Sequence, residues 1–285
     1  MKLDVLLLQF RFVAKDPIGF DVGKAGNTWR GAFGFSLQRR FCVQRKSGGN
    51  CSCSPPCLYS QIFEPAWEGG PSGLSEPPRA FVFRAHDLDG RRFAPGEQFS
   101  LSLHLFTRDA EWVDAFRTAM TDAGAAGLGT RGARAELTKV ETQEFSVPLV
   151  PRDGAPARLT LEFLTPVEIK VEGRIVSSPK FGLLLRRLRD RVSSILSMYQ
   201  GGTPDFDFKQ LGELADRIKT HQAEWRRFDA TRRSMRTGQR HSIGGETGKY
   251  VLSGDFTQIL PWLEAGLWTG VGRQTVWGKG AYRLA

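Results

Sequence analysis

Hydrophobic positions alternate with polar ones in some segments of this chain and recur at helical spacing in others. Alternation at every second position predicts strands over residues 2–14, 80–85, 98–106 and 158–163. Apolar side chains at every third or fourth position predict helices over residues 28–40, 112–123 and 180–199. Strands and helices that alternate along one chain indicate an α+β fold.

Two glycine-rich segments repeat the same order of features. Residues 127–137 and residues 270–280 each follow a helix-like stretch with Gly-x-Gly, then basic residues and another glycine, and then a strand-like end. We interpret this repeat as an internal duplication of one α+β unit, and chance similarity between two glycine turns is the alternative. The duplication predicts two domains, residues 1–152 and residues 153–285.

The second of these segments combines four glycines with Arg273, Trp277 and Lys279. Glycines allow the main chain to approach a ligand closely, while the two cations supply charge for phosphate and the indole offers a stacking face. The loop at residues 270–280 therefore predicts contact with a polyanion. A relaxed turn between two final strands is the alternative.

The balance of charge points in the same direction. Lysine and arginine total 40 against 30 acidic residues, which gives a formal net charge of +10 and a pI near 9.8. Such an excess, most of it arginine, favours nucleic acid or another anionic surface as the partner. The longest apolar run, residues 5–8, is too short to cross a bilayer, so we expect a soluble, cytoplasmic protein without membrane attachment.

All four cysteines fall in one short window of glycine, serine and proline. They are Cys42, Cys51, Cys53 and Cys57. Clustered cysteines in a cytoplasmic chain are more typical of a metal site than of a disulfide framework. Four thiolates could close around a structural zinc ion, with reduced thiols or adventitious disulfides as the alternative. No open coordination position is implied, so we expect no catalytic role for the metal.

The order of several short motifs resembles a known family. Trp29-Arg30-Gly31-Ala32-Phe33-Gly34, the cysteine loop and Phe63-Glu64-Pro65 are followed by Leu164-Thr165-Pro166, Gly244-Gly245 and the last glycine loop. This series is similar to the CRISPR-associated endoribonucleases of the RAMP superfamily that process precursor crRNA. The resemblance covers nearly the whole chain, and it implies two tandem ferredoxin-like (RRM-like) domains.

The resemblance also implies a reaction. Such enzymes cut precursor CRISPR RNA within the repeat stem-loop without a catalytic metal: the ribose 2′-OH attacks the adjacent phosphate, leaving a 2′,3′-cyclic phosphate and a 5′-OH. Among four histidines, His241 is the candidate acid or base, because it follows several arginines and precedes a glycine-rich turn. The family's catalytic histidine often lies near the first helix, where this chain offers Arg30 and Arg39 instead, so an arginine-dominated site is the alternative.

Binding of the repeat RNA is expected to use the arginine-rich segment 224–241, interpreted as a helical insertion, together with the long helix and the last loop. An exposed basic helix end is the alternative. The candidate RNA contacts are Arg186, Arg187, Arg232, Arg233, Arg236, Arg240, Lys249, Tyr250, Arg273, Trp277 and Lys279. Two other functions stay open: a catalytically silent RAMP subunit that binds crRNA alongside other CRISPR effector-complex subunits, and an RNA-binding protein outside CRISPR systems.

Overall fold

The computed structural model describes residues 1–44, 51–66, 77–129, 131–202, 206–233 and 240–285, and gives only the backbone for residues 232, 233, 240 and 241. The chain divides into two compact units. We call residues 6–144 with 232–241 the N-terminal unit, and residues 1–5, 145–231 and 242–285 the C-terminal unit. The domain division at residues 152 and 153 stays a prediction.

Helices and strands alternate along the chain in the following order. In the first half these are β1 (Lys2–Ala14), β2 (Ile18–Gly19), α1 (Ala25–Phe41), α2 (Leu58–Phe63), β3 (Phe81–Arg84), η1 (His86–Leu88), β4 (Arg92–Phe93), β5 (Gln98–Leu105), α3 (Ala110–Ala126) and β6 (Ala135–Pro148). In the second half they are β7 (Arg158–Phe163), β8 (Ile169–Val171), β9 (Arg174–Val176), α4 (Phe181–Tyr199), α5 (Phe208–Arg217), β10 (Lys219–Phe228), β11 (Thr231–Arg233), β12 (Arg240–Ser242), β13 (Gly245–Ser253), α6 (Leu260–Thr269), η2 (Thr275–Trp277) and β14 (Tyr282–Leu284).

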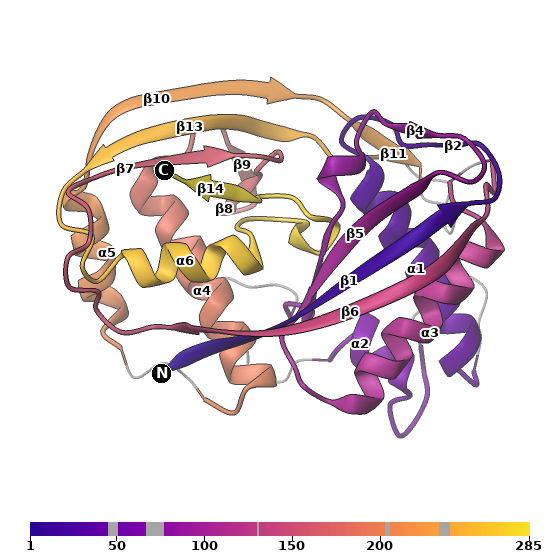
Figure 1. Cartoon of the computed structure of the whole chain (residues 1–285). Helices are drawn as coiled ribbons and strands as arrows, with labels where there is room; N and C mark the ends of the chain where they lie inside the picture. The colour runs from indigo at the N-terminus through magenta and orange to yellow at the C-terminus, as the bar shows by residue number, and fades with distance from the viewer. Residues whose placement is uncertain (45–50, 67–76, 130, 203–205, 234–239) are drawn as a thin grey trace. The chain divides into compact units, whose positions relative to one another are not determined.

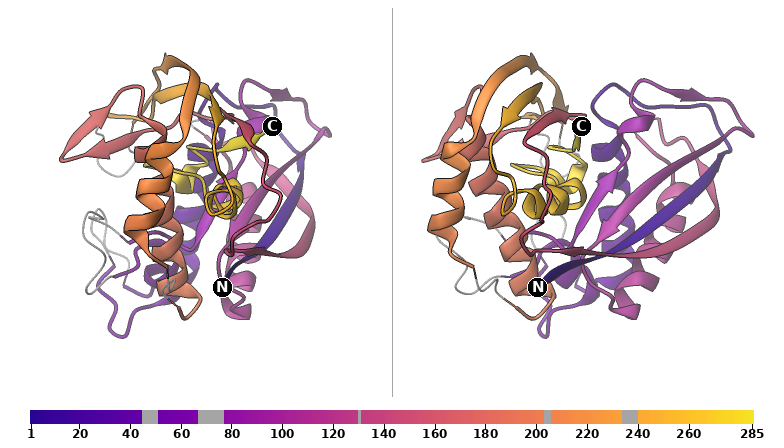
Figure 2. Two further views of the ribbon diagram at one scale, coloured as in Figure 1. Left: turned by 90° about the vertical axis from the view of Figure 1, so that its left-hand side faces the viewer. Right: turned by 60° about the vertical axis from the view of Figure 1, so that its left-hand side comes forward.

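The main sheet of the N-terminal unit has the strand order β3-β5-β1-β6. Strand β1 pairs antiparallel with β5, from Leu6 opposite Leu105 to Val13 opposite Gln98. Helices α1 and α3 pack against each other on one side of this sheet (Figures 1 and 2). The order βαββαβ with this strand arrangement is the ferredoxin-like topology.

Aromatic side chains fill the space between this sheet and its helices. Trp29 and Phe33, on α1, are fully buried, and Phe33 stacks on Phe116 of α3 with ring centroids 4.7 Å apart. Phe12 of β1 lies 4.6 Å from Trp29, measured between ring centroids. The stripe predicted for the first helix is therefore the one that faces the core. Helix α3 begins at an N-cap, where the Asp109 carboxylate accepts hydrogen bonds from the backbone N–H groups of residues 111 and 112.

The C-terminal unit repeats the same topology. Its main sheet has the order β10-β13-β7-β14, and α4 and α6 are the two helices that follow its first and third strands. Strand β13 pairs antiparallel with both β10 and β7. Leu188 of α4, Leu252 of β13 and Leu263 of α6 are fully buried in its core. The predicted α+β fold of tandem ferredoxin-like units is confirmed.

The two glycine loops close in the same way within their own units. In the first, the N–H of Leu128 donates to the carbonyl of Ala133 at 2.8 Å, just after α3. In the second, the N–H of Val271 donates to the carbonyl of Gly280 at 3.1 Å, just after α6. A Cβ on Gly127 would lie 2.6 Å from the carbonyl carbon of Gly132, and its φ of +104° already disfavours an L side chain. These glycines are required by the close approach of the main chain to itself.

One element differs from the sequence prediction. The arginine-rich segment does not start as a helix: residues 219–228 form β10, and the described residues that follow belong to the short strands β11 and β12. Strand β10 is an edge strand whose residues are almost all exposed, so charged side chains on both of its faces remain in water. No helix in the described ranges is both long enough and apolar enough to span a membrane.

Candidate nucleic-acid interface

The last glycine loop has a backbone that only a few residue types accept. Gly272 has a φ of +87°, and a Cβ there would lie 2.6 Å from the carbonyl oxygen of Glu168. Gln274 adopts the left-handed region with a φ of +60°, as does Gly278 with a φ of +84°. The N–H of Arg273 donates to the Glu168 carbonyl at 2.8 Å, which anchors the loop to the segment after β7.

The two cations of this loop have different environments. Arg273 is about half exposed, and its Nη1 lies 2.5 Å from Oε1 of Glu168, whose side chain is only 2% exposed. Lys279 is buried, and its ammonium donates to the carbonyl of Gly244 and, at 2.9 Å, to Oε1 of Gln274. Burial lowers the pKa of Lys279 to about 8, with the positive charges of Arg273 and Arg227 acting in the same direction and Glu168 opposing them.

The loop is also bound to the chain just after His241. The side-chain amide of Gln274 donates to the carbonyl of Ser242 at 3.3 Å, and Lys279 holds the carbonyl of Gly244 two residues later. His241 immediately precedes Ser242 in β12. Arg236 lies outside the described residues, and only the backbone is described for Arg232, Arg233, Arg240 and His241.

Two further predicted contacts lie on β13. Tyr250 is buried: its ring meets the Trp225 ring edge-on, with centroids 5.1 Å apart, and its hydroxyl donates to the carbonyl of Pro179. Burial raises the pKa of Tyr250, and the nearby Glu246 adds to the effect. Lys249, half-buried, lies opposite Glu224 on β10, with its Nζ 3.5 Å from Oε2 of that residue. Trp277 is half-buried in η2.

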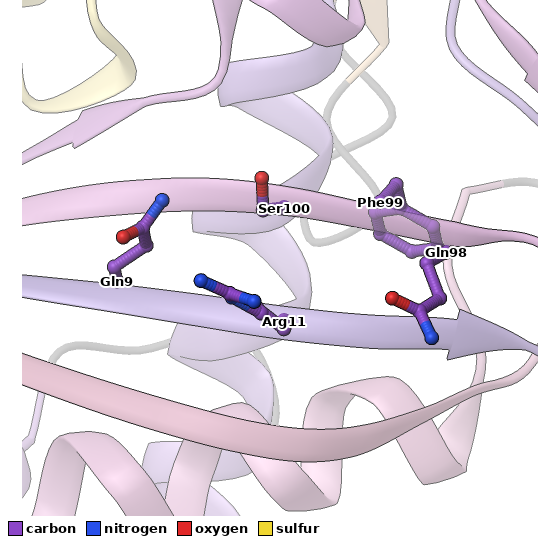
Figure 3. Close-up of a pocket in the computed structure, with 5 residues that line it drawn as sticks. All are labelled: Gln9, Arg11, Gln98, Phe99 and Ser100. Carbon is purple, nitrogen blue, oxygen red and sulfur yellow. The ribbon is translucent and has the colours of Figure 1, made fainter.

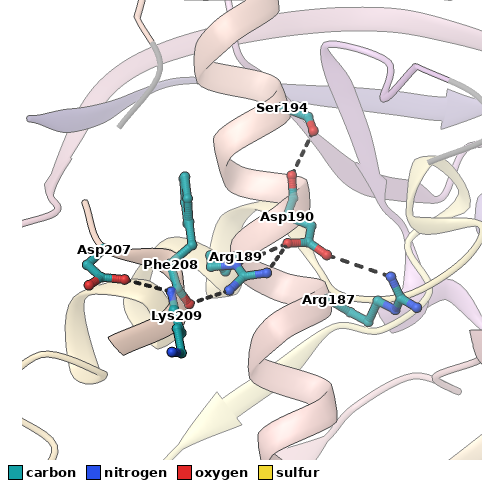
Figure 4. A network of polar contacts seen from close by, with 7 residues as sticks. All are labelled: Arg187, Arg189, Asp190, Ser194, Asp207, Phe208 and Lys209. Carbon is teal, nitrogen blue, oxygen red and sulfur yellow. Dashed lines mark hydrogen bonds and ion pairs between the residues drawn. The ribbon is translucent and has the colours of Figure 1, made fainter. Parts of the chain in front are cut away.

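The arginines of α4 are bound within the C-terminal unit. Arg186 makes a bidentate pair with Asp216 of α5, at 3.0 and 2.7 Å. Arg187 lies 3.6 Å from Asp190, which also accepts from Arg189 (Figure 4). Arg189 donates in addition to the carbonyl of Phe208 at 2.6 Å, so it connects α4 to the start of α5 (Figure 4). Arg186 and Arg189 thus hold α4 and α5 together, whereas Arg187 pairs within α4.

Arg30 and Arg39 lie on α1 of the N-terminal unit. The guanidinium carbon of Arg30 lies 4.1 Å from the centre of the Phe63 ring, a cation–π contact, and Arg30 is half-buried. Arg39 is exposed in the last turn of the helix. The two residues are therefore not equivalent: Arg30 packs on α2, and Arg39 extends toward solvent.

The four cysteines come together at the junction of α1 and α2. Cys42 follows the last residue of α1, and Cys57 precedes the first residue of α2. Their four sulfur atoms all lie within 4.8 Å of one another, and none of them forms a disulfide. This four-cysteine cluster could bind a structural zinc ion.

The other three histidines have defined surroundings. His104 is buried in β5, and His86 has a pKa lowered by burial. His221 is exposed on β10, with Nε2 2.6 Å from the hydroxyl of Ser253.

A shallow hollow on the sheet of the N-terminal unit is lined by none of the predicted site residues (Figure 3). Its lining residues are Gln9, Arg11, Gln98, Phe99 and Ser100.

Two family models match consecutive parts of the chain. One, described as the N-terminal domain AF_1859_N, matches residues 3–156. The other, described as CRISPR-associated endoribonuclease Cas6, matches residues 161–282, which include the whole of the last glycine loop. Residues 161–282 belong to the Cas6 family.

Solved structures of Cas6 proteins share its fold. The product complex of Cas6 (TTHB231) superimposes with a TM-score of 0.61 at 18% identity, over 99% of this chain and 100% of that chain. The product complex of Cas6 (TTHA0078) gives 0.59 at 15% identity, over 98% and 99%. A partial Cas6-RT-Cas1–Cas2 complex gives 0.58 at 14% identity, over 99% of this chain and 46% of that chain. Among curated proteins, none matches the sequence.

One feature of helix α1 was not predicted from the sequence. Phe35, on α1, is 63% exposed, and Gly31 lies one turn before it on the same face. A Cβ on Gly31 would meet nothing within 4 Å, so packing does not explain a glycine that costs about 1 kcal/mol in a helix interior. Arg39 follows one turn after Phe35. The sequence signal for this feature was a large apolar residue, Phe35, outside the buried stripe of the helix and one turn after a mid-helix glycine, Gly31.

Proposed function

We propose that the protein cleaves precursor CRISPR RNA within the repeat by attack of a ribose 2′-OH, without a catalytic metal, and then retains the mature crRNA. The match of residues 161–282 to the Cas6 endoribonuclease family supports the reaction class. The observation that carries the assignment of a site is the attachment of the last glycine loop, with its cations, to the residues directly after His241.

In this mechanism the imidazole of His241 takes or returns one proton. The 2′-oxygen loses its proton as it bonds to phosphorus, the bond from phosphorus to the 5′-oxygen breaks, and the 5′-oxygen gains a proton. A positioned imidazole contributes about 10²- to 10⁴-fold to such a step. An arginine-dominated variant, in which Arg30 and Arg39 align the 2′-OH and neutralise the phosphate, is the alternative within the same reaction.

The loop cations have separate tasks in this proposal. Arg273 is half exposed, so one side of its guanidinium is available to phosphate while Nη1 is paired with Glu168. Lys279 is buried on backbone and amide oxygens, so it positions the loop rather than contacting RNA. Tyr250 likewise stays in the core, and the stacking role is proposed for Trp277 alone of the two.

A second RNA-contacting surface is proposed on α1. The stripe formed by Gly31, Phe35 and Arg39 offers a bare backbone turn, an exposed ring and a cation along one helix face. A base stacked on Phe35 would lie over the turn that carries Gly31, because helical side chains cover the turn that precedes them. Arg232, Arg233, Arg236 and Arg240 are proposed to bind the phosphates of the repeat stem, with a steep dependence on salt.

The reaction is tested with end-labelled repeat RNA from the protein's own locus, in buffer with Mg²⁺ withheld and with Mg²⁺ added. A parallel substrate carries 2′-deoxyribose at the nucleotide before each candidate cut. Cleavage at one position that is independent of Mg²⁺ and abolished by the deoxy substitution is the expected result. Cleavage of the deoxy substrate, or a strict need for Mg²⁺, would refute the proposed chemistry.

The residue assignment is tested by His241→Ala against His221→Ala. His221, exposed on a strand of the C-terminal unit, serves as a histidine control outside the proposed chemistry. His241→Ala is expected to slow single-turnover cleavage by about 10²-fold or more while leaving the Kd for the repeat nearly unchanged. Equal losses of binding and cleavage in His241→Ala would remove it from the acid–base role.

A silent crRNA-binding subunit remains the second candidate, for one specific reason. Both cations of the last loop already have partners inside the protein, Glu168 for Arg273 and main-chain and amide oxygens for Lys279. Tight, repeat-specific binding without cleavage would favour this candidate, and the protein would then act together with other CRISPR subunits. Retention of the cut product is measured by gel shift after the reaction.

A further inference from the structure

The geometry of the cysteine cluster matches a tetrahedral metal centre. The sulfur of Cys42 lies 3.6 Å from that of Cys51 and 3.9 Å from that of Cys53, and the sulfurs of Cys51 and Cys57 are 3.4 Å apart. Four sulfurs bound to zinc at about 2.3 Å form a tetrahedron with edges of about 3.8 Å. A disulfide would instead require about 2.05 Å between two sulfurs.

The segment that carries these cysteines has little apolar surface to fix it. Apart from Cys53, the residues between Cys51 and Cys57 are serines and prolines, all of them exposed, so the segment buries little apolar surface of its own. Hydrogen bonds from the α2 side also hold it. The N–H of Cys51 donates to Oε2 of Glu64 at 2.8 Å, and the side-chain amide of Gln61 donates to the carbonyl of Pro56 at 2.9 Å. The Tyr59 hydroxyl donates to the other carboxylate oxygen of Glu64, the residue just after α2, at 3.0 Å.

Phe63 of helix α2 packs against α1. Phe63 lies so close to Gly34 that a Cβ there would come within 2.6 Å of its Cε2. The same ring also contacts the Arg30 guanidinium, whose carbon lies 4.1 Å from the ring centre. The position of Arg30 thus depends on where α2 lies, and α2 is only six residues long.

We propose that the four cysteines bind one zinc ion, which ties the end of α1 to the start of α2 and so holds Phe63 beneath Arg30. Arg30 is a positioning target of the metal, and any consequence for RNA cleavage rests on the proposed function. The metal site itself does not, because it is argued from the sulfur positions alone. The zinc is saturated by protein ligands, so its role here is structural.

The test begins with metal content. The full-length protein, purified without chelator under reducing conditions and dialysed, is expected to carry about one zinc per chain by elemental mass spectrometry. Cys53→Ser is expected to lose most of it, whereas Ser54→Ala, the adjacent exposed residue outside the cluster, retains it. Substitution of cobalt for zinc should produce the visible absorption of a tetrahedral thiolate site.

The second arm measures the helices. Amide hydrogen exchange in α2 and in the last turn of α1 should speed up on chelation or in Cys53→Ser, while exchange in β7 and β13 of the C-terminal unit should not change. Zinc well below one per chain even after reconstitution, with all four thiols equally reactive toward a thiol reagent with and without zinc, would overturn the site. Zinc bound without protection of α2 would overturn the positioning role. A zinc-loaded protein that fails to cut RNA would contradict the proposed nuclease and leave the metal site standing.

Discussion

Helix α1 contains three glycines, and for two of them, Gly31 and Gly34, the structure predicts opposite effects of the same substitution. At Gly34 a Cβ would lie 2.6 Å from Cε2 of Phe63, an aromatic ring that also contacts the Arg30 guanidinium. At Gly31 a Cβ would meet nothing within 4 Å. Gly34→Ala and Gly31→Ala therefore form a matched pair with the same chemical change in the same helix.

The expected magnitudes follow from three contributions. An extra methyl group forced into a packed site costs about 1 to 3 kcal/mol, and displacing Phe63 also weakens its cation–π contact, worth about 0.5 to 1 kcal/mol. Glycine to alanine in a helix interior returns about 1 kcal/mol at either position. Gly34→Ala should thus lower the free energy of unfolding by about 0.5 to 3 kcal/mol, and Gly31→Ala should raise it by up to about 1 kcal/mol.

The assay is urea denaturation followed by tryptophan fluorescence, since Trp29 is buried on the same helix. The two variants should differ by about 1.5 kcal/mol or more at unchanged slope. Equal stability of the two, or a less stable Gly31→Ala, would refute the packing argument.

The same Gly31→Ala protein also tests the proposed RNA-contacting surface on α1. If a nucleotide approaches the bare turn at Gly31, the variant should be more stable and yet bind repeat RNA several-fold more weakly.

Three further outcomes are expected from other sites. Phe35→Ala should weaken repeat RNA binding by about tenfold in a filter-binding assay, because one stacked base is lost. Val22→Ala, at a similarly exposed position, should not weaken binding, and equal effects of the two substitutions would exclude stacking on Phe35. The pKa of Lys279 is lowered from 10.5 to about 8, so between those pH values the folded state binds fewer protons than the unfolded state. The contribution of Lys279 to the unfolding free energy should therefore rise with pH from about 8 to about 10.5. Urea melts of Lys279→Met at pH 7.5 and 10 should lack that rise. Arg273→Ala should lower the unfolding free energy by about 1 to 3 kcal/mol, because it leaves the Glu168 carboxylate buried without its partner. Adding Glu168→Gln should restore part of that stability but none of the lost RNA affinity. Recovery of both stability and affinity would make the arginine purely structural.

The regular elements were predictable because their side chains follow the period of one face. Trp29, Phe33 and Leu37 recur at helical spacing and are all buried, and the strand over residues 158–163 has the predicted bounds. The arginine-rich segment defeated the same reasoning. Strand β10 is an edge strand with both faces largely in water, so its sequence lacks the alternation that distinguishes a half-buried strand.

Residue types in the candidate site were predictable, but the directions of several side chains were not. The loop over residues 270–280 contains the glycines and cations from which the site was predicted. Yet Lys279 points to the carbonyl of Gly244, and Tyr250 to that of Pro179, both distant in sequence. A local sequence pattern cannot predict contacts between residues so far apart in the chain. The four cysteines, in contrast, lie close together in the sequence, so their proximity in the structure was predictable.

The duplicated architecture itself explains part of the chemistry of the last loop. In each unit an arginine of the glycine loop pairs with an acid that follows the unit's first strand: Arg134 with Asp16 after β1, and Arg273 with Glu168 after β7. In the first copy the pair is exposed, and hydrogen bonds from Arg134 lower the pKa of Asp16 to about 2. Exposed pairs contribute little to stability, but the buried Glu168 needs its partner. The ion pair is therefore a property of the repeated unit, and burial of the acid makes it indispensable only in the second copy.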